Sequence, residues 1–467
     1  MNHNISYANI LNHQRVMTMY EPFEHQKVTT DFINQNPRCL ITSDPGTGKT
    51  RSVLDAIKHN KNRILVLAPL SILESSWGDD ILKFTPYLTY SIAYAKNREK
   101  AFASDAQVII TNHDAVKWIL KSKHLLDDFD TLVIDEFTAF KNKDSQRSKA
   151  CRKIAEQFTY RIAMSGTPNS NTITDIWHPT LIVDDGERLG HRFFSFRSSV
   201  CTSSFNGFAN EWHDKPDAQE IVGAALSDIN IRYELTDCID MPAQSVHTTY
   251  VTLPKKIQQQ YEQLAEDNVL YTGQTTINAV HAGAKVKKLL QLCTGSIYDE
   301  HGTAQGIHAE RYELVMQLVA ERAQSLVAFN WKHEREQLTM LADKMGITYG
   351  VIDGSVAAHK RKDIVDRLQA GQLQVVFCHP QSAGHGLTMT KAKTVIWASP
   401  TYNAEHYVQF NRRIYRAGQT EKTEIIQIAA KDTWETDVYQ KLASKTGKME
   451  ELLSVLKQLH ANRRTAS

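Results

Sequence analysis

The segment CLITSDPGTGKT, residues 39–50, decides the fold. Its first four residues are mostly apolar or β-branched and predict a buried strand, while apolar residues at helical spacing after Thr50 predict a helix. Gly46 and Gly48 lie in the loop between them, where glycine lets backbone N–H groups approach a ligand without a Cβ in the way. A strand, a glycine loop and a helix in this order predict an α/β domain with an anion site at the helix N-terminus.

The side chains of this loop fit the phosphates of a nucleotide. Lys49 is expected to reach the β- and γ-phosphates, and the Thr50 hydroxyl is expected to ligate Mg²⁺. Ser43 stands where the strict pattern has glycine, so the loop is a near match to that pattern. The predicted nucleotide-binding residues of the loop are Gly46, Thr47, Gly48, Lys49 and Thr50.

An acidic pair follows another apolar run. Leu132–Ile134 predicts a strand, and Asp135 and Glu136 come directly after it. Next to a phosphate loop, Asp135 is expected to hold Mg²⁺, and Glu136 to orient or deprotonate the attacking water. The alternative interpretation of such a pair, taken alone, is the start of a helix.

Both halves of the chain repeat one rhythm, in which short apolar runs alternate with helical stretches. This rhythm predicts an α/β fold with two lobes, each a parallel sheet buried on both faces. The predicted strands are Cys39–Thr42, Ile64–Ala68, Val108–Thr111, Leu132–Ile134 and Arg161–Met164, then Leu326–Phe329, Tyr349–Ile352, Val375–Cys378, Val395–Ala398 and Glu424–Ile428. The predicted domains are residues 1–245 and 246–467. Val246–Leu253 is expected to be an extended crossing between the lobes, followed by a polar helix at Lys255–Asn268.

Composition limits the class of protein. The 467 residues include 42% hydrophobic and 23% charged residues, and 54 basic against 52 acidic residues give a net charge of +2. Nucleic acid would therefore need a local positive field. The six cysteines form no Cys-x-x-Cys pair, which argues against a zinc site or a disulfide framework. No apolar run is long enough for a membrane span, so we expect an intracellular protein.

Several ordered segments resemble the motifs of Swi/Snf-type superfamily 2 DNA helicases and translocases, in a compact form similar to bacterial or phage members. In the first half they are Phe23–Gln26, Ser43–Thr50, Leu65–Leu73 with Trp77, Ile109–His113, Asp135–Asn142 and Ser165–Asn169. In the second half they are Lys287–Cys293, Ile352–Ser355 with Arg361, Ser382–Thr388 and Gln409–Gln419. One departure is Phe137-Thr138, where the family usually has Ala-His or Ser-His.

The resemblance implies two tandem RecA-like lobes, with a helical insertion between motifs III and IV. It implies that Gln26 contacts the adenine and that Gly384 also contacts the nucleotide. It further implies that Arg413 and Arg416 act as arginine fingers, so that Lys49, Glu136, Arg413 and Arg416 are the expected catalytic residues. Helical spacing places Gln409, Arg413 and Arg416 on one face of a helix. The expected DNA contacts are Ser71, Thr111, Asn112, His385, Gly386 and Thr388.

The activity implied is that of an ATP- and Mg²⁺-dependent motor that moves along DNA, with duplex DNA as the expected track. We expect a monomer that holds the phosphate backbone without regard to sequence, in the cytoplasm of a bacterial or phage-infected cell. A strand-separating or branch-migrating helicase and a nucleotide-gated remodeller that displaces proteins are the alternatives. A kinase that uses the phosphate loop alone is disfavoured by the arginine motif. His25, His281 and His308 are interpreted as surface or packing residues.

Overall fold

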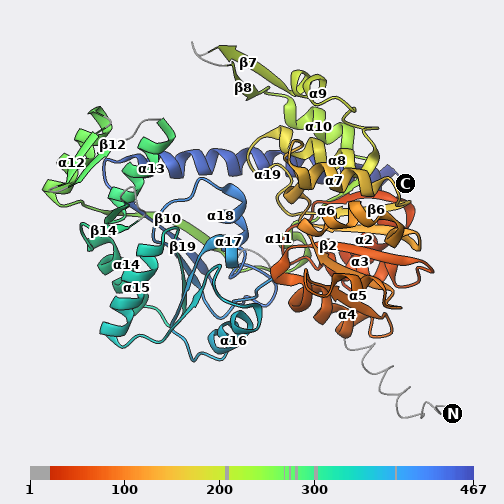
Figure 1. Cartoon of the computed structure of the whole chain (residues 1–467), viewed down its shortest axis with the longest axis horizontal. Helices are drawn as coiled ribbons and strands as arrows, with labels where there is room; N and C mark the ends of the chain where they lie inside the picture. The colour runs from red at the N-terminus through yellow and green to blue at the C-terminus, as the bar shows by residue number, and fades with distance from the viewer. Residues whose placement is uncertain are drawn as a thin grey trace. The chain divides into compact units, whose positions relative to one another are not determined.

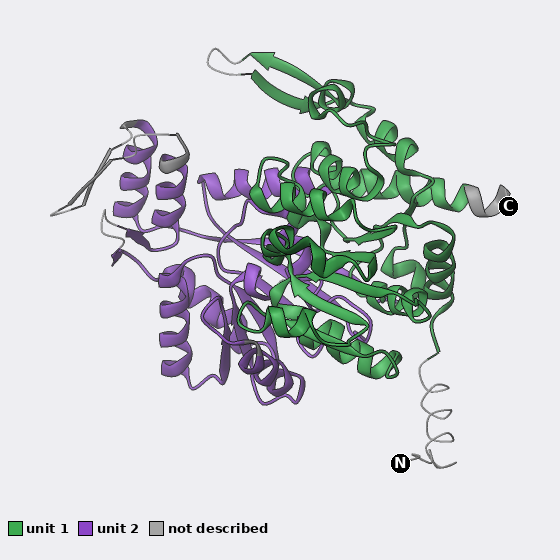
Figure 2. Ribbon diagram, turned by 45° about the vertical axis from the view of Figure 1, so that its right-hand side comes forward, with its two compact units in different colours: residues 1–240, 448–467 green, residues 241–447 purple. Residues whose placement is uncertain are grey.

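The computed structural model describes residues 21–205, 210–267, 269–272, 275–278, 282–298, 303–383 and 386–466. Figure 2 shows the division of the chain into two compact units. Unit 1 consists of residues 1–240 and 448–467, and unit 2 of residues 241–447. Each unit contains a parallel sheet flanked by helices, which confirms the predicted α/β fold with two RecA-like lobes.

The sheet of unit 1 has seven strands in the order β3-β4-β2-β5-β6-β1-β9, and all of its pairs are parallel. The strands are β1 (Arg38–Ile41), β2 (Arg63–Ala68), β3 (Tyr90–Ala93), β4 (Val108–Asn112), β5 (Phe129–Asp135), β6 (Tyr160–Met164) and β9 (Asn230–Ile231). Alternate side chains of β2 enter two different apolar clusters, with Leu65 and Leu67 in one and Ile64 and Val66 in the other. The sheet is therefore buried on both faces, as the unbroken apolar runs predict.

Helices cover this sheet (Figure 1). They are α2 (Glu24–Gln35), α3 (Lys49–Ile57), α4 (Asp79–Phe84), α5 (Arg98–Phe102), α6 (Val116–Ile119), α7 (Gln146–Ala155), α8 (Trp177–Asp184), α9 (Phe193–Val200), α10 (Ala218–Leu226) and α11 (Leu235–Cys238). Shorter turns are η1 (Leu70–Ile72), the π-helical η2 (Leu73–Gly78), η3 (His113–Ala115), η4 (Leu120–Leu126), η5 (Phe137–Phe140) and η6 (Ile173–Ile176). The insertion is not purely helical, because β7 (Cys201–Phe205) and β8 (Asn210–Asp214) form an antiparallel hairpin that extends from α9 in Figure 1.

The sheet of unit 2 has six strands in the order β10-β19-β18-β15-β17-β16, again all parallel. The strands are β10 (Gln244–Val251), β15 (Ser325–Ala328), β16 (Tyr349–Ile352), β17 (Val375–Cys378), β18 (Thr394–Trp397) and β19 (Thr423–Ala430). The segment expected to be a crossing, residues 246–253, is mostly part of β10. This strand pairs with β19 at eight positions, so it is an edge strand of the sheet.

The other elements of unit 2 lie around this sheet. The helices are α12 (Lys255–Asp267), α13 (Ala282–Cys293), α14 (Glu310–Ala320), α15 (Lys332–Met345), α16 (Ala358–Gln369), α17 (Pro380–Ala383) and α18 (Ala404–Asn411). Two small antiparallel pairs are β11 (Val269–Thr272) with β12 (Thr275–Asn278) and β13 (Ser296–Tyr298) with β14 (Ala304–Gly306). Among the described helices, none combines the length and apolarity that a bilayer crossing needs.

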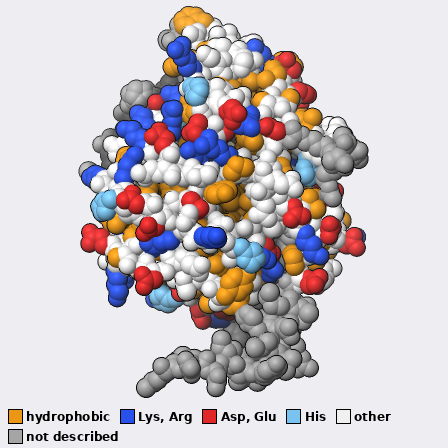
Figure 3. Space-filling view, turned by 90° about the vertical axis from the view of Figure 1, so that its right-hand side faces the viewer, with side chains coloured by type: hydrophobic (Ala, Val, Ile, Leu, Met, Phe, Trp, Pro, Cys, Tyr) orange, Lys and Arg blue, Asp and Glu red, His pale blue; other side chains and the backbone are white. Residues whose placement is uncertain are grey.

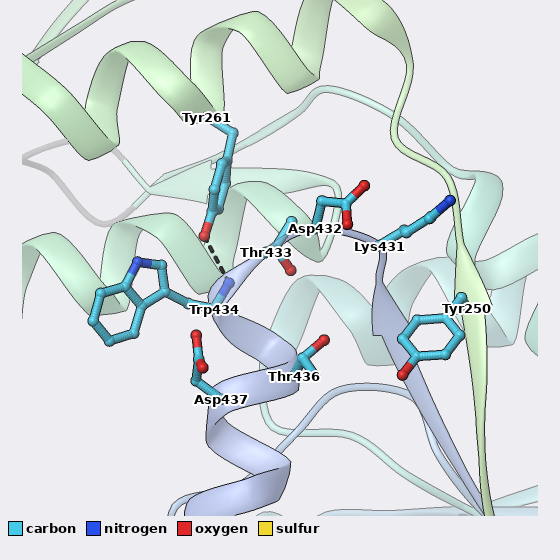
Figure 4. Close-up of a pocket in the computed structure, with 8 residues that line it drawn as sticks. All are labelled: Tyr250, Tyr261, Lys431, Asp432, Thr433, Trp434, Thr436 and Asp437. Carbon is cyan, nitrogen blue, oxygen red and sulfur yellow. Dashed lines mark hydrogen bonds between the residues drawn. The ribbon is translucent and has the colours of Figure 1, made fainter.

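Helix α19 (Trp434–Ala466) belongs to both units. Figure 4 shows its first turn, where the Trp434 backbone N–H donates to the Tyr261 hydroxyl at 2.8 Å. Its later part joins unit 1, where Leu452 and Leu456 enter the apolar cluster beneath the sheet. The predicted domain boundary at residue 245 assigns all of α19, including residues 448–466, to the second lobe. In the structure, residues from 448 onwards belong to unit 1, because the apolar side chains of Leu452 and Leu456 are buried in its core.

Candidate nucleotide site and arginine motif

The phosphate loop, the acidic pair and motif III follow three adjacent strands of unit 1. The order β5-β6-β1 puts the carboxyl ends of these strands at one edge of the sheet. The ladder continues one residue past the strands, since the Glu136 N–H donates to the Met164 carbonyl at 2.8 Å and the Ser165 N–H donates to the Ile41 carbonyl at 3.1 Å. The sheet therefore fixes the backbone positions from which the predicted site residues project.

Two glycines shape the phosphate loop. Gly46 and Gly48 have φ angles of 91° and 81°, in the left-handed region that favours glycine. Gln26 of α2 packs against the loop, and its Nε2 donates to the Thr47 carbonyl at 3.1 Å. A Cβ on Gly48 would lie 2.1 Å from that Nε2 atom, so the backbone conformation favours glycine and any larger residue would displace the Gln26 side chain from the loop.

Two neighbouring side chains of α2 hold the loop. The Gln26 Oε1 atom accepts from the Phe23 N–H at 3.0 Å, while its Nε2 donates to Thr47. His25 Nε2 donates to the same Thr47 carbonyl at 2.8 Å. The half-buried His25 ring also contacts Phe23 and Tyr233, which agrees with its interpretation as a packing residue; the hydrogen bond to the phosphate loop is an addition to that role. The predicted contact of Gln26 with an adenine stays a prediction.

The phosphate loop is held by hydrogen bonds from two residues that follow β9, Arg232 and Tyr233. The guanidinium of Arg232 is buried, pairs with Asp44 at 2.7 Å and donates to the Thr42 carbonyl at 2.6 Å. The hydroxyl of Ser43 accepts from the Tyr233 N–H at 3.0 Å. This bond gives a physical reason for the departure from glycine at position 43. Arg232 and Tyr233 were not among the predicted residues, since no local pattern ties residue 232 to a loop 188 positions earlier.

Lys49 is folded back on the loop and lies close to the acidic pair. Its Nζ donates to the carbonyls of Ser43 and Asp44, at 2.8 and 3.1 Å. Burial lowers the pKa of Lys49 from 10.5 to about 8, although the charges of Glu136, Asp135 and Asp44 raise it. Burial makes the charged form of this lysine unfavourable. A nearby phosphate would supply negative charge and stabilise that charged form.

The oxygen atoms at this edge fit a magnesium ion. Burial raises the pKa of Asp135, even though the Trp77 indole N–H donates to its Oδ2 at 2.9 Å. Thr50 contributes a hydroxyl in the first turn of α3. A carboxylate and a hydroxyl are the oxygen ligands that Mg²⁺ prefers, and a divalent cation would offset the buried negative charge. The assignment of Thr50 and Asp135 as the residues that would hold it stays a prediction.

Glu136 is held in an unusual conformation. It is a non-glycine residue with a φ of 59°. Its Oε1 atom accepts hydrogen bonds from two hydroxyls, that of Thr138 at 3.0 Å and that of Ser165. Left-handed backbone at such a residue persists only where the surroundings fix it, and it occurs preferentially at functional sites.

A cavity of about 590 Å³ in unit 2 (Figure 4) contains none of the predicted site residues, whereas a cavity of about 650 Å³ in unit 1 adjoins the phosphate loop. Four rings line the unit 1 cavity and contact one another in turn. Phe23 is stacked on His25 with ring centroids 5.8 Å apart, His25 is tilted against Tyr233 at 5.6 Å, and Tyr233 meets His460 edge to face at 5.5 Å. Its other lining residues are Glu24, Arg232, Asp237, Cys238, Lys457 and Ala461. Aromatic walls of this kind suit a flat heteroaromatic base.

In unit 2 the residues of the arginine motif do not lie together on one face of a helix. Helix α18 ends at Asn411, so Arg413 and Arg416 lie in the turns that follow and the helical-spacing prediction is wrong. The two arginines nevertheless converge, because both donate to the Leu387 carbonyl, at 3.0 and 3.2 Å. Arg413 also donates to the Gln409 carbonyl at 2.9 Å and is 5% exposed. Motif VI is thus hydrogen-bonded to the motif V loop.

The predicted DNA contacts differ in accessibility. Thr111 is fully buried and its hydroxyl donates to the Ala93 carbonyl at 2.7 Å, which counts against a DNA contact by this side chain. Asn112 is half-buried and accepts from Arg98 at 3.3 Å. Ser71 and Thr388 are half-buried and Gly386 is exposed. Gly384 and His385 lie outside the described residues.

A cavity of about 350 Å³ opens at the carboxyl ends of β15, β16 and β17 in unit 2. Its lining includes cationic and hydrogen-bonding side chains, namely Trp331, Lys332, Arg335, His379, Gln381 and Ser382. Arg335 is paired with Asp353 at 2.7 Å. The predicted motif segments contribute Asp353, Gly354, Ser355 and Ser382 to this lining, whereas nothing in the sequence pattern points to Lys332 or Gln381.

The fold and the motifs define an ATP-binding protein of the helicase type. The family model of the SNF2-related domain matches residues 13–295, and that of the helicase conserved C-terminal domain matches residues 310–418. The first match covers more than half of the chain, so the chain belongs to the SNF2-related family.

Similar proteins occur in phages, bacteria and animals. "Putative protein p41" of Acyrthosiphon pisum secondary endosymbiont phage 1 is 28% identical, over 94% of this chain and 100% of that protein. The "Putative ATP-dependent helicase/translocase YwqA" of Bacillus subtilis is 22% identical over 87% of this chain, which spans 45% of that protein. The chain spans similar shares of the animal relatives, 47% for the mouse "Chromodomain-helicase-DNA-binding protein 1-like". The solved "Sulfolobus solfataricus SWI2/SNF2 ATPase core in complex with dsDNA" is 20% identical, with 94% of each chain covered and a TM-score of 0.44.

Substitution of Gly48 by alanine tests the contact between the loop and Gln26. We expect Gly48→Ala to weaken binding of a fluorescent ATP analogue at least tenfold, because the new Cβ meets Gln26 Nε2. Gly190→Ala is the matched control, since Gly190 has a φ of +77° but nothing within 4 Å of its Cβ position. Equal losses of affinity in the two variants would show that the Gln26 contact is irrelevant.

The lowered pKa of Lys49 predicts a pH-dependent affinity. Between pH 8 and 10.5 the folded protein binds fewer protons at Lys49 than the unfolded chain, so this group favours folding more as the pH rises. ATP binding should change in the opposite direction, because phosphate favours the charged amine. We expect the affinity to fall by up to about tenfold per pH unit above pH 8. Calorimetry in two buffers of different ionisation enthalpy should detect proton uptake at pH 8.5, which Lys49→Arg should not show.

Proposed function

We propose that this protein is a DNA-dependent ATPase motor that couples ATP hydrolysis to translocation along DNA, with duplex DNA as its track. One observation carries the proposal: the loop after β1 brings Lys49 into electrostatic contact with Asp135 and Glu136, at the end of β5 two strands away in the same parallel sheet. A lysine on a phosphate loop beside an acidic pair suits hydrolysis of a nucleoside triphosphate. Family membership supports a helicase-type use of that chemistry.

In the proposed ATP site each residue has a separate task. Lys49 exchanges its carbonyl partners for the β- and γ-phosphates, and the N–H groups of Gly46, Thr47 and Gly48 cradle them. The base occupies the aromatic cavity beside His25. Thr50 and Asp135 hold Mg²⁺, which supplies charge neutralisation when bound. Glu136 orients the attacking water and accepts its proton.

The second lobe completes this site in the proposal. Arg413 and Arg416 would stabilise negative charge that develops on the transferred phosphoryl group, and Gly384 would contact the nucleotide. Arginine fingers of this type contribute about 10³-fold or more in related phosphoryl transfers. Both arginines donate to the Leu387 carbonyl, and Leu387 is the residue after Gly386. A movement of the arginines would therefore shift the loop that is proposed to contact DNA.

On the DNA side we propose contacts with phosphate rather than with bases. Ser71, Asn112, Gly386 and Thr388 remain candidates, to which the cavity at Lys332 and Gln381 is added. Figure 3 shows a face on which Lys and Arg side chains are interspersed with Asp and Glu, in line with the net charge of +2. Affinity would therefore depend on local phosphate contacts and decrease with salt. We propose that a monomer acts on the DNA.

Phosphate release without DNA, with single-stranded DNA and with duplex DNA tests this function. We expect duplex DNA to stimulate turnover several-fold, because in a motor the binding of the DNA backbone must be coupled to ATP hydrolysis. Lys49→Ala should remove turnover in every condition. Equal rates with and without DNA would contradict the motor. Higher stimulation by single strands would favour a strand-separating helicase.

The role of the arginine motif can be tested in the same assay. Arg413→Lys should lower kcat at least tenfold while affinity for the ATP analogue stays within about twofold, because the residue acts on the transition state. Lysine keeps the charge at this buried position, and circular dichroism checks the fold. Arg412→Lys is the control. Normal turnover in Arg413→Lys would refute the assignment of the second lobe.

A further inference from the structure

Resting on the proposed function, we propose that Thr138 is a positioning residue that orients Glu136 for hydrolysis. Thr138 stands where the resemblance leads us to expect histidine, so its side chain must interact differently at this position. The structure shows its hydroxyl 3.0 Å from Glu136 Oε1, as the donor of a hydrogen bond. The threonine therefore acts through Glu136 and not on the substrate.

The location of Thr138 makes this contact specific. Thr138 is 2% exposed and lies in η5, the turn that follows the acidic pair. Glu136 precedes this turn in left-handed conformation, which returns its carboxylate towards the residue two positions on. Because a β-branched side chain has few rotamers and this one is enclosed, the hydroxyl is held in place at little further entropic cost.

Each hydroxyl has a single proton to donate, and this fixes the direction of the hydrogen bonds around Glu136. The Ser165 hydroxyl accepts from the Thr167 N–H at 3.1 Å, and its own proton goes to Glu136 Oε1. The Thr138 proton goes to the same oxygen. An ionised carboxylate is an acceptor only, so both hydroxyls match the charged form that a general base needs.

Two donors on one oxygen give the carboxylate a defined orientation. Both Thr138 and Ser165 donate to Oε1, so the two hydroxyls together fix the plane and direction of the carboxylate. Proton abstraction requires hydrogen-bond reach and alignment, so a loss of orientation lowers the rate more than it lowers binding.

Replacement of Thr138 by valine removes the hydroxyl while nearly preserving volume. We expect Thr138→Val in the full-length protein to lower kcat for DNA-stimulated hydrolysis about tenfold, with KM for ATP and affinity for the ATP analogue changed less than twofold. Thr138→Ser restores the hydroxyl and should return kcat to within about twofold of the original. This separation of kcat from KM, with rescue by serine, is not expected of a packing residue.

Thr180→Val is the matched control, because Thr180 is also buried in unit 1 but donates its hydroxyl to the Ile176 carbonyl within a helix. It should leave kcat unchanged. If Thr138→Val turns over normally while Lys49→Ala is inactive, the positioning role is refuted and the proposed ATPase stands. Equal damage in Thr138→Ser and Thr138→Val also refutes it. If the unaltered protein does not hydrolyse ATP, both proposals fail.

Discussion

Parallel pairing of β5, β6 and β1 is the constraint on which the candidate site depends. Three loops from distant parts of the sequence share one edge because their strands are neighbours in one register. The bonds from Glu136 to the Met164 carbonyl and from Ser165 to the Ile41 carbonyl extend that register into the loops. A slip of one residue would reverse the direction of every side chain, so the apolar core and the site are specified together.

The charge distribution around the loop explains its chemistry. Lys49 and Arg232 face Asp44, Asp135 and Glu136, so carboxylates outnumber cations. Arg232 is engaged by Asp44, which leaves Lys49 as the cation closest to the acidic pair. A buried carboxylate is costly without compensation, and the raised pKa of Asp135 expresses that cost. A divalent cation and a phosphate group would each relieve part of the imbalance.

Much of this arrangement was predictable from the sequence. The unbroken apolar runs located the strands, and the glycine loop and the acidic pair located the phosphate edge, because these features are local in the chain. Contacts between distant segments were not predictable: nothing in residues 230–233 points to the phosphate loop, and nothing near His460 points to a cavity shared with Phe23. Helical spacing also misplaced Arg413, since apolar periodicity does not show that α18 ends at Asn411.

Helix α19 gives the chain an unusual order of assembly. Unit 1 is discontinuous in sequence, because residues 241–447 intervene before the segment that contributes Leu452 and Leu456 to its core. On the ribosome, the strands of unit 1 emerge long before those two leucines. The nascent first unit must therefore wait, with part of its apolar surface uncovered, until unit 2 has been synthesised. Chaperone binding during this interval would protect that surface, and the aromatic cavity beside the phosphate loop acquires its wall at His460 only at the end of the process.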